Sequence, residues 1–413
     1  MTTPAYGLLG YPLGHSYSPE IHRALGNPNY ALIEADEQEL DRVLREKKFI
    51  GLNVTIPYKK KVMPYCHRLT ERAARIGSVN TITLDRDGNL VGDNTDYDGF
   101  SYMLRQSGMN VHGQKGLVLG SGGASRTVCT VLADRGARVV VISRGGEDNY
   151  ENLEKHTDAT YLVNTTPVGM YPKNGESPVD LTRLPHLRGV LDLIYNPSRT
   201  ALMLQAQSLG IATAGGLSML VAQAKAAHER FFRTTVSWNA VGRITRKLQK
   251  KMRNLVLVGM PGCGKSTLAR RVAAMTGREV VDTDRLIEEM SGKAPADLIR
   301  SEGVAVLRRW ETMALRSVCS RGGQIIATGG GIVTVPENIP LLRENSTVVF
   351  LNRPISHLST FNRPLSSSPE ALKKMYEERL PLYRTACDVE LWDNRGAKAF
   401  FATMPRKLKR LVR

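Results

Sequence analysis

The chain has 413 residues, of which 42% are hydrophobic and 23% charged, a composition typical of globular proteins. At about 100–200 residues per domain, this length predicts two or three domains. Lys and Arg number 57 against 39 Asp and Glu, a net charge of +18 that favours anionic ligands. Aromatic residues make up only 6% and do not interleave with the basic stretches, so a stacking platform for single-stranded nucleic acid is not expected.

The cysteines and the N-terminal sequence bear on the cell compartment. Five cysteines lie far apart and form no CxxC pair, which predicts neither a disulfide framework nor a zinc site. The opening MTTPAYGLLGYPLG has no charged region followed by a long apolar run, and no stretch reaches the roughly 20 apolar residues of a membrane span. We therefore expect a cytoplasmic protein that binds neither membrane nor nucleic acid; its oligomeric state stays open.

Short apolar strands alternate with amphipathic helical stretches, a pattern that predicts α/β layers with parallel sheets. In the first hundred residues this pattern predicts strands at 6–10, 31–35 and 52–56 and helices at 19–25 and 38–48. Segments 81–84 and 90–91 flank an Asp-Gly turn, which is typical of a hairpin.

A second unit is expected from about residue 100. A strand at 116–119, a glycine cluster, a helix and the β-branched run RVVVIS form one βαβ unit, and LVNTT, VLDLI and IATAGG predict later strands. A helix at 217–232 ends this half. Residues 234–253 show little apolar periodicity and much positive charge, so they are expected to be a linker; the basic runs there and at 406–413 are interpreted as solvated helix faces or linker. The strand NLVLVG then opens a new α/β domain.

The sharpest motif is GMPGCGKST, which matches GxxxxGK[ST] between a strand and a helical stretch. Its glycines let backbone amides converge on phosphate oxygens at the positive end of the following helix. Lys265 would pair with the β- and γ-phosphates, and Ser266 would bind Mg²⁺. The motif thus predicts a nucleotide with β- and γ-phosphates and Mg²⁺ as ligands, held by Gly259, Gly262, Gly264, Lys265, Ser266 and Thr267.

A second glycine cluster, GSGGAS, lies between a strand and a helix and predicts a dinucleotide site. Its residues are Gly120, Gly122, Gly123, Ala124 and Ser125. The next strand ends in Ser143 and Arg144 rather than in an acidic residue. Because an arginine suits a 2′-phosphate, NADP(H) is the expected cofactor.

From Leu255 to about Asp393 the chain resembles shikimate kinase through the P-loop, DTD, LRRWE, ATGGG, NRPL and PLYR in the family's order. The resemblance implies that Asp282 helps to hold Mg²⁺ and that Asp284 binds the substrate hydroxyls and assists the attacking one. An N-cap at the start of a helix is an alternative role for these carboxylates. The other residues that it implies are Arg308 for the substrate carboxylate, Arg384 as a second substrate-binding arginine, Arg363 as a lid arginine over the phosphates, and Gly329, Gly330 and Gly331 beside the substrate.

Residues 1 to about 232 resemble shikimate dehydrogenase through SYSP, NVTIPYK, GSVNT, GDNTD, NTTPVGM, YNP and GGLSMLVAQA. The resemblance implies that Lys59 is catalytic and that Asp96 is its partner carboxylate. It implies substrate contacts for Ser16, Ser18, Thr55, Asn80, Tyr195 and Gln223, and a second cofactor loop with Asn164 and Thr165.

Together the resemblances imply a bifunctional enzyme that reduces 3-dehydroshikimate to shikimate with NADPH and then phosphorylates shikimate with ATP. The expected architecture is an α/β substrate domain at 1–99 with the returning helix 217–232, a Rossmann-like NADP domain at 100–216, a basic linker at 233–253 and a P-loop kinase domain at 254–413. Three alternatives stay open: only one active half, activity on quinate in the first half, or nucleic-acid binding by the basic segments.

Overall fold

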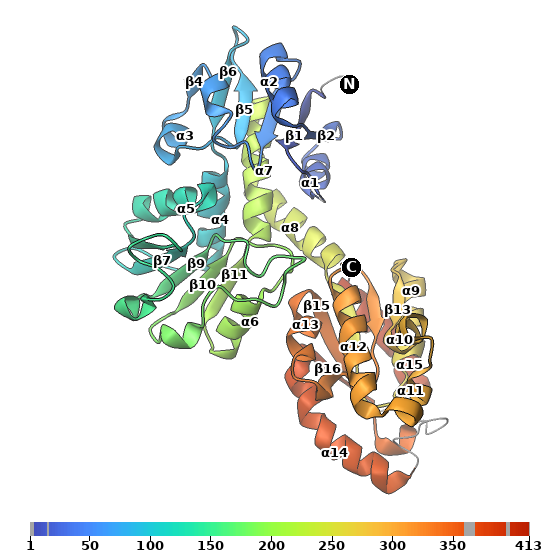
Figure 1. Ribbon diagram of the computed structural model, residues 1–413. Coiled ribbons are helices and arrows are strands. Elements are labelled where there is room, and N and C mark those ends of the chain that lie inside the picture. Colours follow the sequence, from blue (N-terminus) through green and yellow to red (C-terminus); the bar gives the residue numbers. More distant parts are fainter. Residues whose placement is uncertain (1–3, 15, 359–367, 394–396, 413) are drawn as a thin grey trace. The chain divides into compact units, whose positions relative to one another are not determined.

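The computed structural model describes residues 4–14, 16–358, 368–393 and 397–412 (Figure 1). The chain divides into two compact units. The first comprises Met1–Val168, Ser177–Tyr195 and Gln205–Arg246, and the second Gly169–Glu176, Asn196–Leu204 and Lys247–Arg413, as far as those ranges are described. None of the helices in the described ranges is long and apolar enough to cross a membrane.

The first sheet belongs to the expected substrate domain and has six strands in the order β2-β1-β3-β5-β6-β4. β1 pairs in parallel with β2 and β3, whereas β5 runs antiparallel to β3 and β6, which confirms the hairpin predicted at the Asp-Gly turn. Its strands are β1 (Tyr6–Gly10), β2 (Tyr30–Glu34), β3 (Gly51–Val54), β4 (Arg68–Leu69), β5 (Thr81–Leu84) and β6 (Leu90–Asp93). Its helices are α1 (Ser18–Ala24), α2 (Glu37–Glu46) and α3 (Glu71–Ile76).

The second sheet is wholly parallel, with the order β11-β10-β9-β7-β8. Parallel strands buried on both faces need helices over them, which is the Rossmann-like arrangement that the sequence predicted. The strands are β7 (Lys115–Leu119), β8 (Arg138–Ile142), β9 (Tyr161–Asn164), β10 (Gly189–Asp192) and β11 (Ala212–Gly215). The helices of this region are α4 (Asp96–Ser107), α5 (Gly123–Asp134), α6 (Ala201–Ser208) and α7 (Leu217–Phe232).

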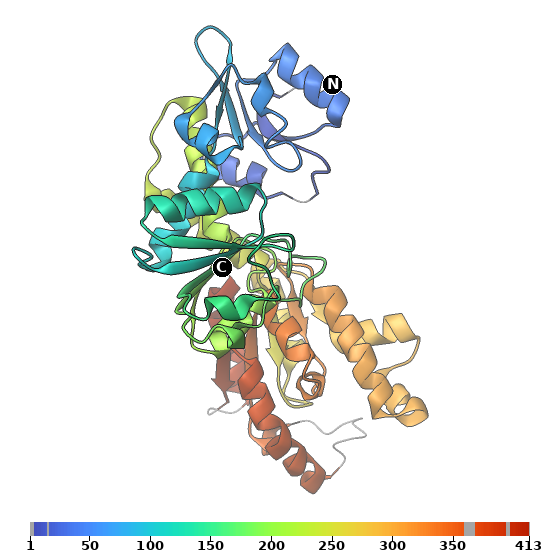
Figure 2. The same ribbon diagram turned by 60° about the vertical axis from the view of Figure 1, so that its left-hand side comes forward.

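Helices α4 and α7 lie side by side in the first unit (Figure 1; Figure 2). Their contact is close because α4 carries Gly99: a β-carbon there would lie 2.7 Å from the backbone oxygen of Met219 and 3.0 Å from Cβ of Gln223. The first residue of α4 is Asp96, so this contact positions an expected site residue.

Most of residues 234–253, expected to be a linker with little apolar periodicity, form the helix α8 (Trp238–Met252). That expectation about periodicity is wrong. Buried side chains recur one to four residues apart along one helix face, at Ala240, Val241, Ile244, Leu248 and Met252. Intervening exposed cations, such as Arg243 and Lys247, obscured the stripe. The basic run is thus the solvated face of an amphipathic helix.

The third sheet belongs to the P-loop domain and is parallel, in the order β13-β14-β12-β15-β16. The motif strand β12 lies at its centre, and all five of its residues are buried. The strands are β12 (Asn254–Val258), β13 (Val280–Asp282), β14 (Ile325–Ala327), β15 (Ser346–Asn352) and β16 (Val389–Trp392).

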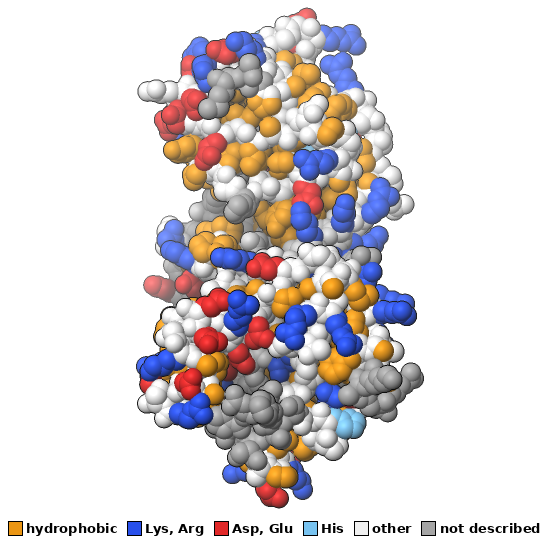
Figure 3. Space-filling view, turned by 90° about the vertical axis from the view of Figure 1, so that its right-hand side faces the viewer, with side chains coloured by type: hydrophobic (Ala, Val, Ile, Leu, Met, Phe, Trp, Pro, Cys, Tyr) orange, Lys and Arg blue, Asp and Glu red, His pale blue; other side chains and the backbone are white. Residues whose placement is uncertain are grey.

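Helices on both faces of this sheet complete its core, as expected for an α/β fold. They are α9 (Lys265–Thr276), α10 (Thr283–Ser291), α11 (Pro295–Glu302), α12 (Val304–Cys319), α13 (Asn338–Glu344), α14 (Pro369–Ala386) and α15 (Ala397–Val412). On the face of the molecule drawn in Figure 3, acidic side chains lie among the basic ones. The excess positive charge is therefore not gathered into one uninterrupted patch on that face.

Two candidate active sites

A lysine–carboxylate pair lies where β6 leads into α4. Lys59 Nζ donates to Asp96 Oδ2 at 2.6 Å, and the two side chains are 24% and 12% exposed. A charge-assisted bond of this length fixes the ammonium in place. Because an ammonium has three N–H donors, Lys59 can still donate to the oxygen of a bound ligand. The structure therefore brings together two residues that come from distant motifs.

Asn80 connects the sheet to the start of α4. Its Oδ1 accepts from Thr95 N at 2.7 Å, from Thr95 Oγ1 at 3.1 Å and from Thr81 Oγ1 at 3.0 Å, and the residue is only 3% exposed. The carbonyl side of the amide thus holds the residue before Asp96 in place. The Nδ2 group is not needed for these bonds, so its donors can serve a substrate hydroxyl.

The serine loop and Tyr195 approach each other. Tyr17, between the two predicted serines, contacts the ring of Tyr195 edge-on with centroids 6.3 Å apart. Ser18 N donates to Ser16 Oγ at 3.2 Å. Burial, with a smaller contribution from Tyr17, raises the pKa of Tyr195, so its phenol stays protonated at neutral pH.

The dinucleotide loop has the geometry that a pyrophosphate requires. Gly120 adopts a φ of +100°, a conformation that favours glycine, and Gly122 is the N-cap of α5. A β-carbon at Gly122 or Gly123 would meet nothing within 4 Å, so the positive end of α5 faces open space. Ser125, by contrast, is 2% exposed and its Oγ faces Cys129, so its side chain packs inside the domain.

The residues after β8 suit a 2′-phosphate. Ser143 and Arg144 follow the strand directly, and Gly146 N donates back to Ser143 O at 3.2 Å to form a tight turn. Arg144 is exposed at this turn. An exposed guanidinium beside the end of the second strand fits the phosphate of NADP(H).

The predicted second cofactor loop uses its polar side chains internally. Asn164 is fully buried; its Nδ2 donates to Asp192 Oδ1 at 3.1 Å and its Oδ1 accepts from Thr166 N at 3.0 Å. Thr165 Oγ1 donates to Leu119 O at 2.6 Å. No part of the Asn164 side chain is accessible, so this amide does not form the surface of the loop. The two residues instead shape the loop beside Gly120, where a β-carbon would lie 3.1 Å from Thr165 Oγ1.

Thr55 and Gln223, two further expected substrate contacts, are held by different elements. Thr55 follows β3, and its backbone N donates to Leu9 O at 2.9 Å. Gln223 lies on α7 against Gly99, one helical turn beyond Asp96, and its Nε2 donates to Leu220 O at 2.9 Å. Gln223 thus lies against the first turn of α4, the turn that begins with Asp96, because α4 and α7 pack so closely.

In the second unit, the P-loop curls as its glycines predicted. Gly259, Gly262 and Gly264 have φ of +149°, +80° and +92°. Lys265, the first residue of α9 and only 7% exposed, donates from Nζ to Gly259 O at 2.9 Å and to Met260 O at 3.0 Å. The ammonium therefore lies over the loop that would hold the phosphates. Thr267 is exposed on α9.

Ser266 and Asp282, the two predicted Mg²⁺ ligands, lie together. Ser266 Oγ donates to Asp282 Oδ2 at 2.6 Å, and Asp282 Oδ1 accepts from Asp284 N at 3.1 Å. Asp282 is thus also the N-cap of α10. A hydroxyl and a carboxylate are hard oxygen donors that fit Mg²⁺, which takes few protein ligands and completes its shell with water and phosphate. No group of three or more His, Cys, Asp or Glu side chains that could hold a metal occurs within the described ranges.

The triple glycine after β14 brings three charged side chains close to the backbone. A β-carbon at Gly331 would overlap the guanidinium of Arg308, and one at Gly329 would lie 2.8 Å from both Asp284 Oδ1 and Glu311 Oε1. Arg308 also pairs with Glu311. Burial raises the pKa of Glu311, and Arg308 opposes that effect. A carboxyl and a guanidinium thus converge beside Asp284.

Arg384 is not part of this group, which corrects the assignment made from PLYR. It pairs with Glu390 at 3.2 Å, is 47% exposed and lies over the Trp392 ring. Arg379 takes the inner position: it is 9% exposed and its Nη1 donates to Gly330 O at 3.0 Å. The buried residues of α14 mark its inner face, and they could have identified Arg379: Leu372, Met375, Arg379, Tyr383 and Ala386. Arg363 lies outside the described residues.

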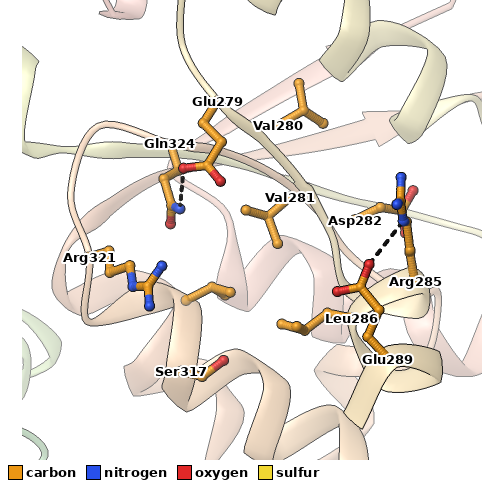
Figure 4. A pocket seen from close by; sticks show the side chains of 11 residues that line it. Glu279, Val280, Val281, Asp282, Arg285, Leu286, Glu289, Ser317, Arg321 and Gln324 are labelled. Carbon is orange, nitrogen blue, oxygen red and sulfur yellow. Dashed lines mark hydrogen bonds and ion pairs between the residues drawn. The ribbon is translucent and has the colours of Figure 1, made fainter. Parts of the chain in front are cut away.

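A separate cavity of about 350 Å³ lies between β13, α10 and the end of α12 (Figure 4). An Arg285–Glu289 ion pair and a hydrogen bond from Gln324 to Glu279 line it. Of the predicted kinase residues only Asp282 borders it, so it is not the P-loop site.

The first unit has the form of a dinucleotide-dependent oxidoreductase, and the P-loop domain that of a nucleotide-dependent phosphotransferase. The family model for the shikimate dehydrogenase substrate binding domain matches residues 8–82, and that for shikimate kinase matches residues 261–408. A shikimate dehydrogenase (NADP⁺) of Caldanaerobacter subterraneus subsp. tengcongensis is 37% identical over 251 residues, 54% of this chain and 89% of the relative.

Solved structures agree with the sequence comparison. A chorismate mutase/shikimate 5-dehydrogenase fusion protein from Clostridium acetobutylicum is 37% identical with a TM-score of 0.57, and the match covers 61% of this chain and 99% of that one. A shikimate 5-dehydrogenase from Thermus thermophilus, solved with NADP(H) and shikimate, is 30% identical with a TM-score of 0.54, covering 59% and 98%. The chain thus belongs to the shikimate dehydrogenase family and carries a shikimate kinase domain behind its dehydrogenase part.

Proposed function

We propose that the chain is a bifunctional enzyme that reduces 3-dehydroshikimate to shikimate with NADPH and phosphorylates the 3-hydroxyl of shikimate with ATP and Mg²⁺. The observation that carries the proposal is the presence of two separate sites: the 2.6 Å Lys59–Asp96 pair and the P-loop with its Ser266–Asp282 pair. The product of the first reaction is the substrate of the second, which independently supports both assignments.

In the dehydrogenase, reduction of a ketone needs a hydride at carbon and a proton at oxygen. NADPH supplies the hydride when bound. The Lys59 ammonium donates to the carbonyl oxygen, neutralises the negative charge that develops there and provides a route for the proton, while Asp96 keeps the ammonium in place. The loop at Gly120–Gly123 holds the pyrophosphate and Arg144 the 2′-phosphate. Substrate groups are bound by Ser16, Ser18, Thr55, Asn80, Tyr195 and Gln223.

In the kinase, phosphoryl transfer depends mainly on positioning and on charge neutralisation. Lys265 leaves its two backbone acceptors to bind the β- and γ-phosphates, and Ser266 with Asp282 holds Mg²⁺. Asp284 accepts the proton of the attacking hydroxyl. Arg308 and Arg379, rather than Arg384, bind the substrate carboxylate beside the triple glycine.

Two separate assays of the purified full chain test the halves. Oxidation of NADPH on addition of 3-dehydroshikimate tests the first, and formation of ADP from ATP and Mg²⁺ on addition of shikimate tests the second. Activity in both supports the proposal. Activity in only one would contradict bifunctionality and leave the other half as a scaffold.

A further inference from the structure

Four charged side chains form an alternating ion-pair cluster beside the dehydrogenase site: Arg72, Asp93, Asp98 and Arg230, called here the Asp93 cluster. Arg72 bonds Asp93 at 3.1 Å and Asp98 at 2.9 Å. Arg230 bonds Asp98 at 2.9 Å and also pairs with Asp93. Each cation therefore bridges both carboxylates, and each carboxylate bridges both cations.

The cluster is shielded enough for its pairing to matter. The Asp93 side chain is 9% exposed, and those of Arg230 and Asp98 are 23% and 27% exposed. Burial raises the pKa of Asp93, but Arg230, Thr70 and Arg72 outweigh that effect, so the net pKa lies below its ordinary value. Removal of one arginine would leave a shielded carboxylate with half of its ion pairs, which is costly.

The position of the cluster links it to the reacting groups. Asp93 ends β6 and Asp98 lies in the first turn of α4, so the two carboxylates flank Asp96 in the sequence. Arg230 lies on α7 seven residues after Gln223, which is two helical turns along the same face. Helix α7 thus contacts α4 at two places, through Gln223 against Gly99 and through Arg230 bound to Asp98.

Arg230 is itself fixed to its helix. Its Nη1 donates to Ala226 O at 2.7 Å, which leaves Nε and Nη2 for the two carboxylates. Since all three nitrogens of its planar guanidinium are engaged, a shift of α4 relative to α7 would stretch several bonds at once. The cluster therefore resists movement between the helix that carries Asp96 and the helix that carries Gln223.

We propose that Arg230 is a positioning residue of the dehydrogenase: through Asp93 and Asp98 it holds the start of α4 against α7, so that Asp96 keeps its bond to Lys59 while Gln223 faces the same substrate. The proposal rests on the dehydrogenase function proposed above. Displacement of a catalytic group by about 1 Å can lower the rate up to about 100-fold, so a fixed position of Asp96 matters for the rate.

The test compares variants of the full chain. Arg230→Met removes the charge and keeps the stem, Arg230→Lys keeps a cation, and Arg45→Met breaks an exposed ion pair with Asp41 on α2 as the matched control. We expect Arg230→Met to lower kcat for 3-dehydroshikimate reduction about tenfold, with KM for NADPH changed less than about twofold. Arg230→Lys should recover most of the rate. Arg45→Met should keep the wild-type kcat for 3-dehydroshikimate reduction. The shikimate kinase rate should be the same in every variant.

A folded Arg230→Met variant with wild-type kcat would overturn the proposal, as would equal losses of kcat and of the kinase rate, which would indicate general destabilisation. If thermal unfolding shows that Arg230→Met does not fold, Asp98→Asn decides, because it keeps both arginines on Asp93 and should lower kcat severalfold; an unchanged kcat there would also overturn the proposal. A wild-type chain that does not oxidise NADPH would instead contradict the proposed function.

Discussion

The two lysines at the centre of the sites have opposite surroundings. Lys59 is 24% exposed and is bound to the carboxylate of Asp96, whereas Lys265 is 7% exposed and is bound to the backbone oxygens of Gly259 and Met260. A lysine that stabilises a developing alkoxide benefits from a permanent anionic partner, which fixes its position through the reaction. A lysine that binds phosphate needs weak, neutral partners that it can leave.

The strongest test of this comparison removes each lysine in turn. Lys59→Ala should abolish NADPH oxidation, about 100-fold or more, and leave phosphorylation intact, because the lost group stabilises charge only in the first site. Lys265→Ala should do the reverse. Parallel NADPH and ADP assays on both variants check this. Loss of both activities in one folded variant would show that the sites are not independent.

A pair of arginines on α14 provides a matched comparison within the kinase. Arg379→Met should raise KM for shikimate about 10- to 100-fold, since a charge-assisted bond contributes about 1.5–3 kcal/mol. Arg384→Met, whose arginine lies in an exposed pair with Glu390, should change KM less than about twofold. Kinase assays at varied shikimate decide between them, and the reversed result would restore the assignment made from the sequence.

The close contact of α4 with α7 can be tested by adding a single methyl group. Gly99→Ala places a β-carbon 2.7 Å from the Met219 oxygen, so the helices must move apart at a cost of about 1–3 kcal/mol in unfolding free energy. We expect lower dehydrogenase activity. Denaturant titration should also show that the first unit unfolds at a lower denaturant concentration. Kinase activity in the same samples is the internal reference; an unchanged dehydrogenase would mean that the contact is not needed.

The smallest effect concerns a buried histidine in the first unit. Burial, and then the neighbouring His228, lowers the pKa of His22 to about 3; the ring is fully buried and stacks on Tyr30 at 3.8 Å. Its folded pKa lies below the ordinary 6.5, so its stabilising effect is complete above pH 6.5 and is lost as the pH falls towards 3. We expect the first unit to lose about 2 kcal/mol between about pH 6.5 and pH 5.

The control is His22→Phe, which keeps a ring against Tyr30 and removes the titration. Unfolding curves at several pH values should show a weaker dependence on pH in that variant. Identical slopes in both proteins would exclude His22 as the source.

The sequence predicted the fold and both sites best where backbone geometry demands particular residues. Gly120 and Gly264 adopt positive φ as their motifs require, and the Asp-Gly turn forms its hairpin. Short motifs also predicted that Lys59 and Asp96 would meet, although 37 residues separate them.

Other features depend on tertiary contacts that no local pattern encodes. Arg379 and Arg384 lie close together in the sequence, and either could bind the substrate. Only the buried face of α14, which includes Arg379 and not Arg384, distinguishes them. In the sequence alone Asn164 resembles a ligand-binding amide. In the structure its amide donates to Asp192 on another strand, a contact that the sequence does not predict. The Asp93 cluster joins residues from α3, β6, α4 and α7, so the sequence offers no sign of it.

If one chain carries both activities, it should convert 3-dehydroshikimate into shikimate 3-phosphate by itself, and a single coupled assay measures this. The purified chain is mixed with 3-dehydroshikimate, NADPH, ATP and Mg²⁺, and shikimate 3-phosphate is detected by mass. We expect shikimate 3-phosphate to form and to require both NADPH and ATP. If NADPH is consumed and shikimate accumulates, or if NADPH is not consumed while added shikimate is phosphorylated, only one half of the chain is active and the enzyme is not bifunctional.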